Sequence, residues 1–132
     1  MELSISVLIT VLVSGLCIGW LAEFSYKSLE REKIVWPLLV NVQMYGYAGV
    51  FSYFLFLLHL SPALVILLIL VFTTGIEFAI GYFLLRFKGV RLWDYTENIY
   101  NYKGIVCAEF SLYWLGAALL YYYVVLPSIV GV

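Results

Sequence analysis

Three long runs without a charged residue limit what this chain can fold into. No Asp, Glu, Lys or Arg occurs in residues 3–22, 34–76 or 110–132. A helix needs roughly 20 apolar residues to cross a bilayer, so the middle run is long enough for two crossings. Hydrophobic residues make up 65% of the chain and charged residues 11%, which leaves too few polar groups to cover a soluble domain of this length. The sequence therefore predicts a multi-pass membrane protein.

The basic residues fall in two segments that flank the predicted spans. They are Lys27, Arg31 and Lys33, then Arg86, Lys88, Arg91 and Lys103. Cations divided between the ends of spans do not form one basic face, so they do not indicate nucleic-acid binding. Both segments belong to odd-numbered connections, and the positive-inside rule places such connections in the cytoplasm. The predicted topology has both the N-terminus and the C-terminus outside.

The hydrophobic pattern predicts an all-α fold with four transmembrane helices in an antiparallel bundle. The expected helices cover about 4–24, 38–59, 62–85 and 105–126, in one domain that spans residues 1–132. The first run opens with Glu2 and lacks a small-residue cleavage site, so it is interpreted as a mature helix rather than a signal peptide.

Each expected helix has one stripe that combines a polar side chain with small residues at a spacing of about four. The small residues are Gly15, Gly19, Gly49, Gly81 and Gly116, and the polar ones on the same stripes are Glu23, Asn41, Glu77 and Glu109. Small residues at this spacing let membrane helices approach closely. The four stripes are expected to form a shared inner surface.

The acidic side chains of the spans are the main candidates for function. An ionised carboxylate facing lipid costs several kcal/mol, so Glu77 is expected to face protein or a wet cavity. It either bonds Tyr or Thr hydroxyls and locks the bundle, or it contacts an ion, a proton or a substrate. For Glu23 the alternative is a solvated carboxylate at the interface. The substrate- or ion-binding candidates are Glu23, Asn41, Gln43, Glu77 and Glu109.

The connection over residues 87–103 is rich in aromatic and basic side chains. Its rings are expected to lie at the headgroup level, in an interfacial segment able to bind anionic lipid headgroups. The candidates for this contact are Arg86, Lys88, Arg91, Trp93, Asp94 and Tyr95. A plain membrane-seated loop is the alternative, in which Asp94 caps a short helix or pairs with Arg91.

Several motifs resemble those of the ABC-transporter type IV (permease-like) family of small bacterial membrane proteins. They are Ile18-Gly-Trp-Leu-Ala-Glu23, Tyr45-Gly46, Glu77 with Gly81, and Arg91-Leu-Trp-Asp-Tyr95, followed by Asn101, Gly104, Cys107, Ser111, Trp114 and Pro127. The resemblance covers nearly the whole chain. The sequence departs from the pattern at Ile105, where a basic residue is usual, and at Glu109, where no acid is expected.

The resemblance implies a permease-like or transporter-associated subunit of the bacterial cytoplasmic membrane. In such a subunit, the five substrate- or ion-binding candidates are expected to line an inward-facing polar pocket. No GxxxxGK[ST] motif is present, so an ATPase would be a separate protein. Besides membrane lipids, the expected partners are further copies of the chain or another membrane subunit.

Two alternative functions remain. One is a small membrane enzyme acting on a lipid or isoprenoid, and the other is a non-catalytic assembly or sensory subunit. No cofactor or metal is expected, because Cys17 and Cys107 lack metal-ligand spacing.

The predicted topology can be tested by cysteine labelling in intact cells. Cysteines introduced at Ser61 and at Val132 should react with an impermeant reagent added outside, and one introduced at Ser28 should not. The parent chain, with Cys17 and Cys107 alone, measures the background. Labelling at Ser28 but not at Ser61 or Val132 would reverse the orientation of the whole chain.

Overall fold

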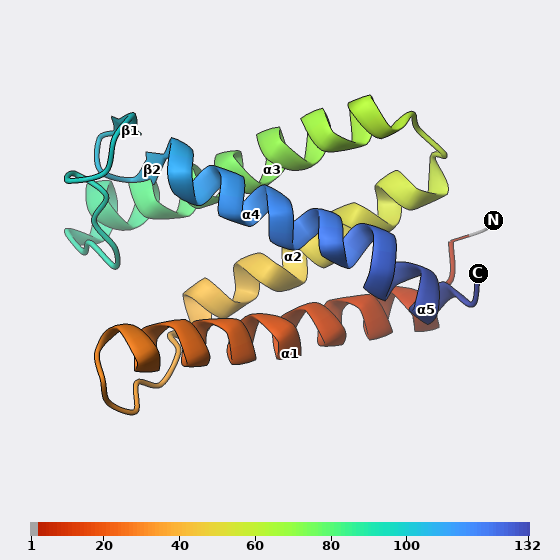
Figure 1. The fold of residues 1–132 in the computed structure, drawn as a ribbon, viewed down its shortest axis with the longest axis horizontal. Coiled ribbons are helices and arrows are strands. Elements are labelled where there is room, and N and C mark those ends of the chain that lie inside the picture. Colours follow the sequence, from red (N-terminus) through yellow and green to blue (C-terminus); the bar gives the residue numbers. More distant parts are fainter. Residues whose placement is uncertain (1–2) are drawn as a thin grey trace. The chain divides into compact units, whose positions relative to one another are not determined.

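A computed structural model describes residues 3–132, which are mainly helical (Figure 1). The elements in chain order are α1 (Ile5–Glu30), α2 (Leu39–Leu57), α3 (Pro62–Phe83), the π-helical turn η1 (Leu84–Lys88), β1 (Asn101–Tyr102), β2 (Val106–Cys107), α4 (Ala108–Leu120), the π-helical turn η2 (Tyr121–Val125) and α5 (Leu126–Val130). The helix η1 continues α3, and α4, η2 and α5 follow one another without a break.

Three of these helical segments are long and apolar enough to cross a membrane: Ile5–Glu30, Pro62–Lys88 and Ala108–Val130. The predicted all-α membrane protein is confirmed at this level. The helix α2 coincides with the second expected helix and contains no charged residue, but Asn41 and Gln43 lower the hydropathy of its first turns. The four-span count, the outward position of both termini and the antiparallel bundle stay predictions.

Two helix boundaries differ from the sequence-based expectation for local reasons. The helix α1 runs to Glu30 instead of about residue 24, and side-chain pairs one turn apart support its polar end. Glu23 and Lys27 form an ion pair at 2.9 Å, and the Tyr26 hydroxyl donates to Glu30 at 3.5 Å. The helix α4 begins at Ala108 instead of about residue 105, because the residues before it pair as strand β2 with β1.

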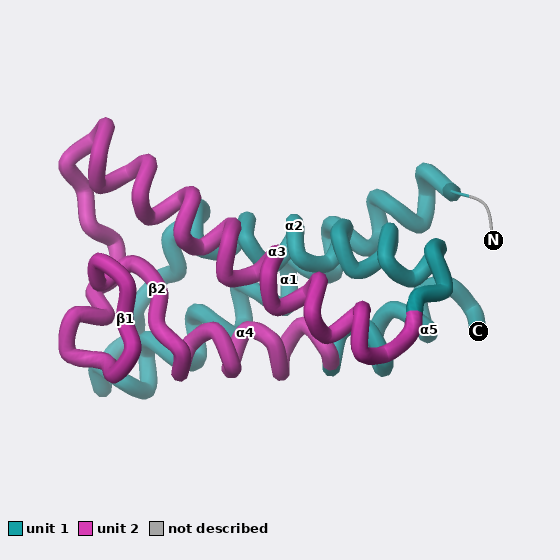
Figure 2. The backbone as a smooth tube through the Cα atoms, turned by 90° about the horizontal axis from the view of Figure 1, so that it is seen from above, with its two compact units in different colours: residues 1–60, 120–132 teal, residues 61–119 magenta. Residues whose placement is uncertain are grey.

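The described chain divides into two compact units (Figure 2). The first, drawn in teal, contains the residues up to Leu60 together with Leu120–Val132, and the second, drawn in magenta, contains Ser61–Leu119. The boundary at residues 119–120 therefore falls inside the last long helical segment. Each unit has its own packing and is described separately.

In the first unit, α1 and α2 pack in antiparallel order through their glycines. A Cβ atom added to Gly15 would lie 2.8 Å from the Tyr45 carbonyl oxygen and 3.0 Å from Gly46 Cα, and one on Gly19 would lie 2.5 Å from the Tyr45 ring. Nearer the other end of the pair, the Ser4 backbone N–H donates to the Tyr53 hydroxyl at 3.3 Å. The two backbones can approach this closely only because these positions carry no side chain.

The η2 turn completes the core of the first unit. The Tyr121 hydroxyl donates to the Val11 carbonyl oxygen at 3.1 Å and lies 2.7 Å from the Ser14 hydroxyl. A Cβ on Gly49 would meet the same Tyr121 ring at 3.4 Å. Since a buried hydroxyl needs a partner, these contacts fix the side of α1 on which η2 packs.

The second unit has a buried face on α3 with a spacing of four. It consists of Val65, Ile69, Thr73 and Glu77. The Thr73 hydroxyl donates to the Ile69 carbonyl of its own helix at 2.9 Å, whereas Thr74 donates to Ser111 of α4 at 3.0 Å. The hydroxyls of Thr73 and Thr74 therefore both donate to acceptors within the second unit.

Large apolar side chains cover the outer faces of the predicted spans. Ile5 is 73% exposed on α1, Val71 is 61% exposed on α3 and Leu112 is 63% exposed on α4. Apolar surfaces of this extent are an aggregation hazard in water, whereas hydrocarbon solvates them at no cost. They are consistent with lipid contact along all three segments.

A matched pair of glycine substitutions tests the α1–α2 contact. Gly15→Ala should lower the free energy of unfolding by about 1–3 kcal/mol, because its Cβ would overlap backbone atoms rather than a movable side chain. Gly75→Ala is the control, since nothing lies within 4 Å of the added Cβ. The measurement is thermal unfolding of the purified protein in detergent. Equal stability of the two variants would show that α1 and α2 are not in close contact.

Candidate functional site

The connection between η1 and α4 is an ordered loop that ends in a β-hairpin. Strands β1 and β2 are antiparallel, with Tyr102 opposite Val106. Lys103 and Gly104 both have positive φ, 55° and 66°, and the Ile105 N–H donates to the Tyr102 carbonyl at 3.0 Å. Glycine tolerates this conformation best, and here a Cβ would also meet Arg91 Nη1 at 2.6 Å. The turn therefore favours glycine at position 104 both for its positive φ and for the lack of space for a side chain.

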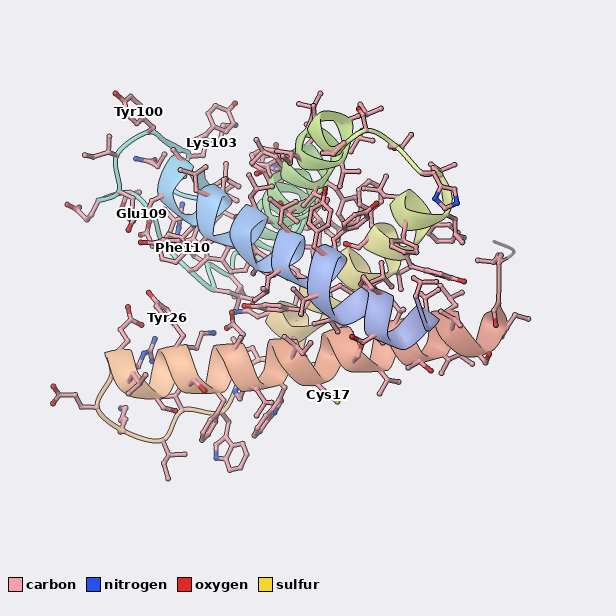
Figure 3. The ribbon with its side chains drawn as sticks, turned by 45° about the vertical axis from the view of Figure 1, so that its right-hand side comes forward. Cys17, Tyr26, Tyr100, Lys103, Glu109 and Phe110 are labelled. Atoms are coloured by element: carbon pink, nitrogen blue, oxygen red, sulfur yellow. The ribbon has the colours of Figure 1, made fainter. Side chains whose placement is uncertain are left out.

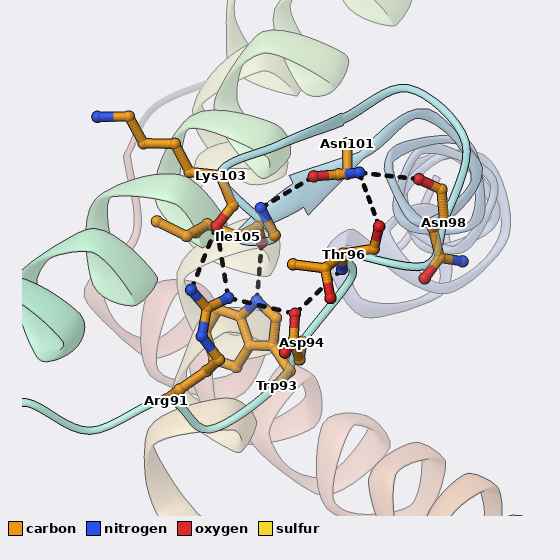
Figure 4. A network of polar contacts seen from close by, with 9 residues as sticks. Arg91, Trp93, Asp94, Thr96, Asn98, Asn101, Lys103 and Ile105 are labelled. Atoms are coloured by element: carbon orange, nitrogen blue, oxygen red, sulfur yellow. Dashed lines mark hydrogen bonds and ion pairs between the residues drawn. The ribbon is translucent and has the colours of Figure 1, made fainter.

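Side chains of the Arg91–Tyr95 motif hold this loop together (Figure 4). The Arg91 guanidinium donates to the Lys103 carbonyl at 3.4 Å and pairs with Asp94 at 3.3 Å. The Trp93 indole N–H donates to the Ile105 carbonyl at 2.8 Å. The motif therefore clamps the second half of the loop to the first.

Asn101 closes the same network from the hairpin. Its amide donates to the carbonyls of Thr96 at 3.2 Å and Asn98 at 3.0 Å, while its Oδ1 accepts the Gly104 N–H at 3.0 Å. The Thr96 backbone N–H donates to Asp94 Oδ1 at 3.0 Å, and this bond, together with the Thr96 hydroxyl and the Arg91 charge, lowers the pKa of the Asp94 carboxyl. Asp94 therefore holds the turn as a charged group.

Gly81 of α3 provides the place where the loop packs on the helix. A Cβ at this position would lie 2.5 Å from the Ile105 side chain and 2.9 Å from the Trp93 ring. Ile105 is 3% exposed, so its side chain fills an apolar contact. Leu84, Leu85 and Leu92 extend the same surface.

Glu77 is joined to the loop by Tyr95. The Tyr95 hydroxyl donates to Glu77 Oε1 at 2.8 Å, and the Glu77 residue is 2% exposed. The Tyr95 ring stacks on Phe110 of α4 with a centroid distance of 4.6 Å, and its backbone N–H donates to the Gly104 carbonyl at 2.9 Å. One tyrosine thus links the carboxylate on α3 with the hairpin and with α4.

Glu109 lies in the first turn of α4, where the helix dipole favours a negative charge. It is exposed, and its carboxylate accepts hydrogen bonds from Asn98 at 3.1 Å and from Tyr113 at 3.2 Å. Figure 3 shows Glu109 beside Phe110, with Tyr100 and Lys103 on the neighbouring hairpin. Tyr113 is 61% exposed, and a Cβ on Gly116 would meet nothing within 4 Å. The expected α4 stripe of Glu109, Tyr113 and Gly116 is therefore exposed.

In the first unit, Glu23 is the centre of a polar cluster between α1 and α2. In addition to its ion pair with Lys27, its carboxylate accepts from Asn41 Nδ2 and from the Tyr45 hydroxyl, both at 3.3 Å. Asn41 is 5% exposed. Gln43 is half-buried and lies two residues, or about 200°, around α2 from Asn41. The structure therefore brings Asn41, but not Gln43, to Glu23.

The five ion- or substrate-binding candidates are divided between the two units. Glu23, Asn41 and Gln43 belong to the first, and Glu77 and Glu109 to the second. Within residues 3–132, no group of three or more His, Cys, Asp or Glu side chains could hold a metal ion. The acidic pocket that would combine the candidates stays a prediction.

Of the six interfacial candidates, four make contacts within the loop, and two of these four, Arg91 and Asp94, are also exposed. Arg91, Trp93, Asp94 and Tyr95 make the contacts described above, whereas Arg86 and Lys88 project from η1. The sequence did not indicate the part played by Thr96 and Asn98. Their only signal is a cluster of turn-forming residues after Asp94, which predicts a turn but not its partners.

Comparison with known proteins assigns the chain to a family. A family model described as "Putative ABC-transporter type IV" matches residues 10–132. The chain belongs to this family. No curated protein and no solved structure matches it. With its apolar helices, the chain is an integral membrane protein of an ABC-transporter-type family. The residues of its most specific motif build the loop that packs on α3.

The bond between Tyr95 and Glu77 can be tested with a matched pair of tyrosine substitutions. Tyr95→Phe should lower the free energy of unfolding by about 1–3 kcal/mol, because a buried carboxylate loses a donor. Tyr100→Phe also removes one hydroxyl, but Tyr100 is 85% exposed and the change should be within experimental error. Thermal unfolding in detergent measures both. A Tyr95→Phe variant as stable as the parent would mean that this bond does not hold the loop.

Proposed function

We propose that the protein is a permease-like subunit of an ABC-type transport system, with four membrane spans and a separate ATPase. The fourth span would be α2. Its 19 residues extend about 28 Å as a helix, close to the thickness of the hydrocarbon core. Asn41 and Ser52 on this helix are buried, so their polar groups would not meet lipid.

The proposed orientation rests on the basic residues. Arg31 and Lys33 follow α1, and Arg86, Lys88, Arg91 and Lys103 lie between the apolar part of α3 and α4. The positive-inside rule favours a cytoplasmic position for both connections and outward termini, in the cytoplasmic membrane of a bacterium. Glu23, Glu77 and Glu109 then belong to the inner half of the membrane or to its inner surface.

The buried carboxylate of Glu77 is the observation that carries the transport role. An ionisable side chain that is 2% exposed on an apolar span is costly to keep, and such residues commonly belong to ion, proton or substrate pathways. Its bond to Tyr95 connects it to the cytoplasmic loop, the part of the chain accessible to a soluble partner. We propose that Glu77 supplies the acidic group of an inward-facing site within the second unit.

The sequence has no phosphate-binding GxxxxGK[ST] motif, so ATP hydrolysis would come from another polypeptide. We propose further copies of the chain or another membrane subunit as its partners within the membrane. The ATPase and the membrane partner would each bind directly to a surface of this chain.

Co-purification tests the proposal. A tagged chain isolated from its own membranes in mild detergent should elute with a vanadate-sensitive ATPase, and the ATPase should co-migrate with it on size exclusion. The variant Glu77→Gln keeps the size and hydrogen-bonding capacity of the side chain but cannot ionise. It should retain the partner and reduce ATP hydrolysis by the complex.

Two results would contradict the proposal. An eluate without ATPase, together with lipid turnover by the purified protein, would support the membrane-enzyme alternative. A Glu77→Gln complex with unchanged ATP hydrolysis at every pH would restrict Glu77 to holding the loop.

A further inference from the structure

A lysine rests on an aromatic cluster where α3 meets the hairpin. Lys103 Nζ lies 5.3 Å from the centroid of the Tyr82 ring and 5.5 Å from that of Tyr102. Phe78 stacks on Tyr82 at 5.6 Å and contacts Tyr102 at 5.7 Å. Two rings from different elements therefore fix the position of the ammonium group, which none of the described ion pairs neutralises.

The position of Tyr82 along α3 gives the depth of this cluster in the membrane. Tyr82 is 20 residues after Pro62, the first residue of the helix, or about 30 Å along its axis. This distance matches the thickness of the hydrocarbon core. If Pro62, the first residue of the candidate span, is placed at one boundary of the core, the Lys103 ammonium beside Tyr82 lies near the other, where lipid phosphates begin.

Exposed apolar side chains accompany the lysine on the same loop. Tyr100 is 85%, Ile99 76% and Tyr102 57% exposed. Aromatic and aliphatic side chains beside cations are typical of protein surfaces that lie in the interfacial region of a bilayer. A water-facing loop would bury or omit them, so their exposure favours contact with the headgroup region.

The charge of this region suits an anionic ligand. Residues 86–103 contain four basic and two acidic side chains. Of the acids, Asp94 is held by Arg91 and Thr96, and Glu97 is exposed. The hairpin follows directly from a membrane span, so a lipid phosphate is the anion that this position meets first.

We propose that Lys103, held on Tyr82 and Tyr102, is a binding site for the phosphate of an anionic phospholipid at the inner boundary of the membrane. Tyr100 and Ile99 insert beside the bound headgroup. The site does not depend on the transport role. It requires that α3 spans the membrane, and its place at the inner boundary rests on the orientation proposed above. Lys103 is not among the interfacial candidates taken from the sequence alone, and most of those candidates make contacts that hold the loop together.

Lipid titration of the delipidated full-length protein tests the proposal. Native mass spectrometry should detect binding of phosphatidylglycerol in preference to phosphatidylcholine. Lys103→Asn removes the charge and suits the positive φ of 55° at this position. It should weaken phosphatidylglycerol binding about fivefold, as expected for the attraction of one lysine to anionic headgroups. Lys103→Arg keeps a cation over the rings and should retain the preference.

Lys33→Asn is the matched control, because it removes one exposed cation from the other basic connection. It should leave the preference unchanged, and an equal loss in both variants would overturn the proposal in favour of a general charge effect. Inorganic phosphate gives the second control. The melting temperature of the delipidated protein is measured with inorganic phosphate and, separately, with phosphatidylglycerol. An equal rise with both would show that the ligand is a soluble anion and would refute the lipid site.

Discussion

The cost of placing charge in hydrocarbon governs how this chain is organised. It confines the basic side chains to two segments of the chain and favours partners for the acids of the described α-helices. Glu23 is matched by Lys27, Glu77 by the Tyr95 hydroxyl, and Glu109 by Asn98. The same cost explains why the long apolar faces of the helices remain exposed, since lipid rather than protein would cover them.

Contacts between the helices depend on small residues and hydrogen bonds rather than on burial of apolar area. Lipid is as apolar as a leucine side chain, so a helix gains little by exchanging one for the other. The chain instead brings backbones together at Gly15 and Gly19, and places a loop against Gly81. Hydrogen bonds from hydroxyl groups, such as Thr74 to Ser111 and Tyr121 to Val11, then fix which sides of the helical segments face each other.

The most specific family motif has a structural explanation. Arg91, Trp93, Asp94 and Asn101 bond to one another or to the backbone of the loop, and Gly104 supplies a turn that other residues adopt poorly. Their spacing is thus the spacing that folds the loop and seats it on α3. A different part of the loop is exposed, namely Lys103 and its neighbouring aromatic side chains.

The sequence alone determined the membrane class, the approximate helices and the family, because hydrophobicity, charge and motif spacing act locally along the chain. It could not determine the end of α1, the strand pairing before α4, or the outward face of Glu109 and Tyr113. Nor could it separate Gln43 from Asn41, or show that Tyr95 reaches Glu77 and that Lys103 lies over Tyr82. Those features join residues that are distant along the chain, and only the tertiary structure decides which of several polar or aromatic neighbours a side chain meets.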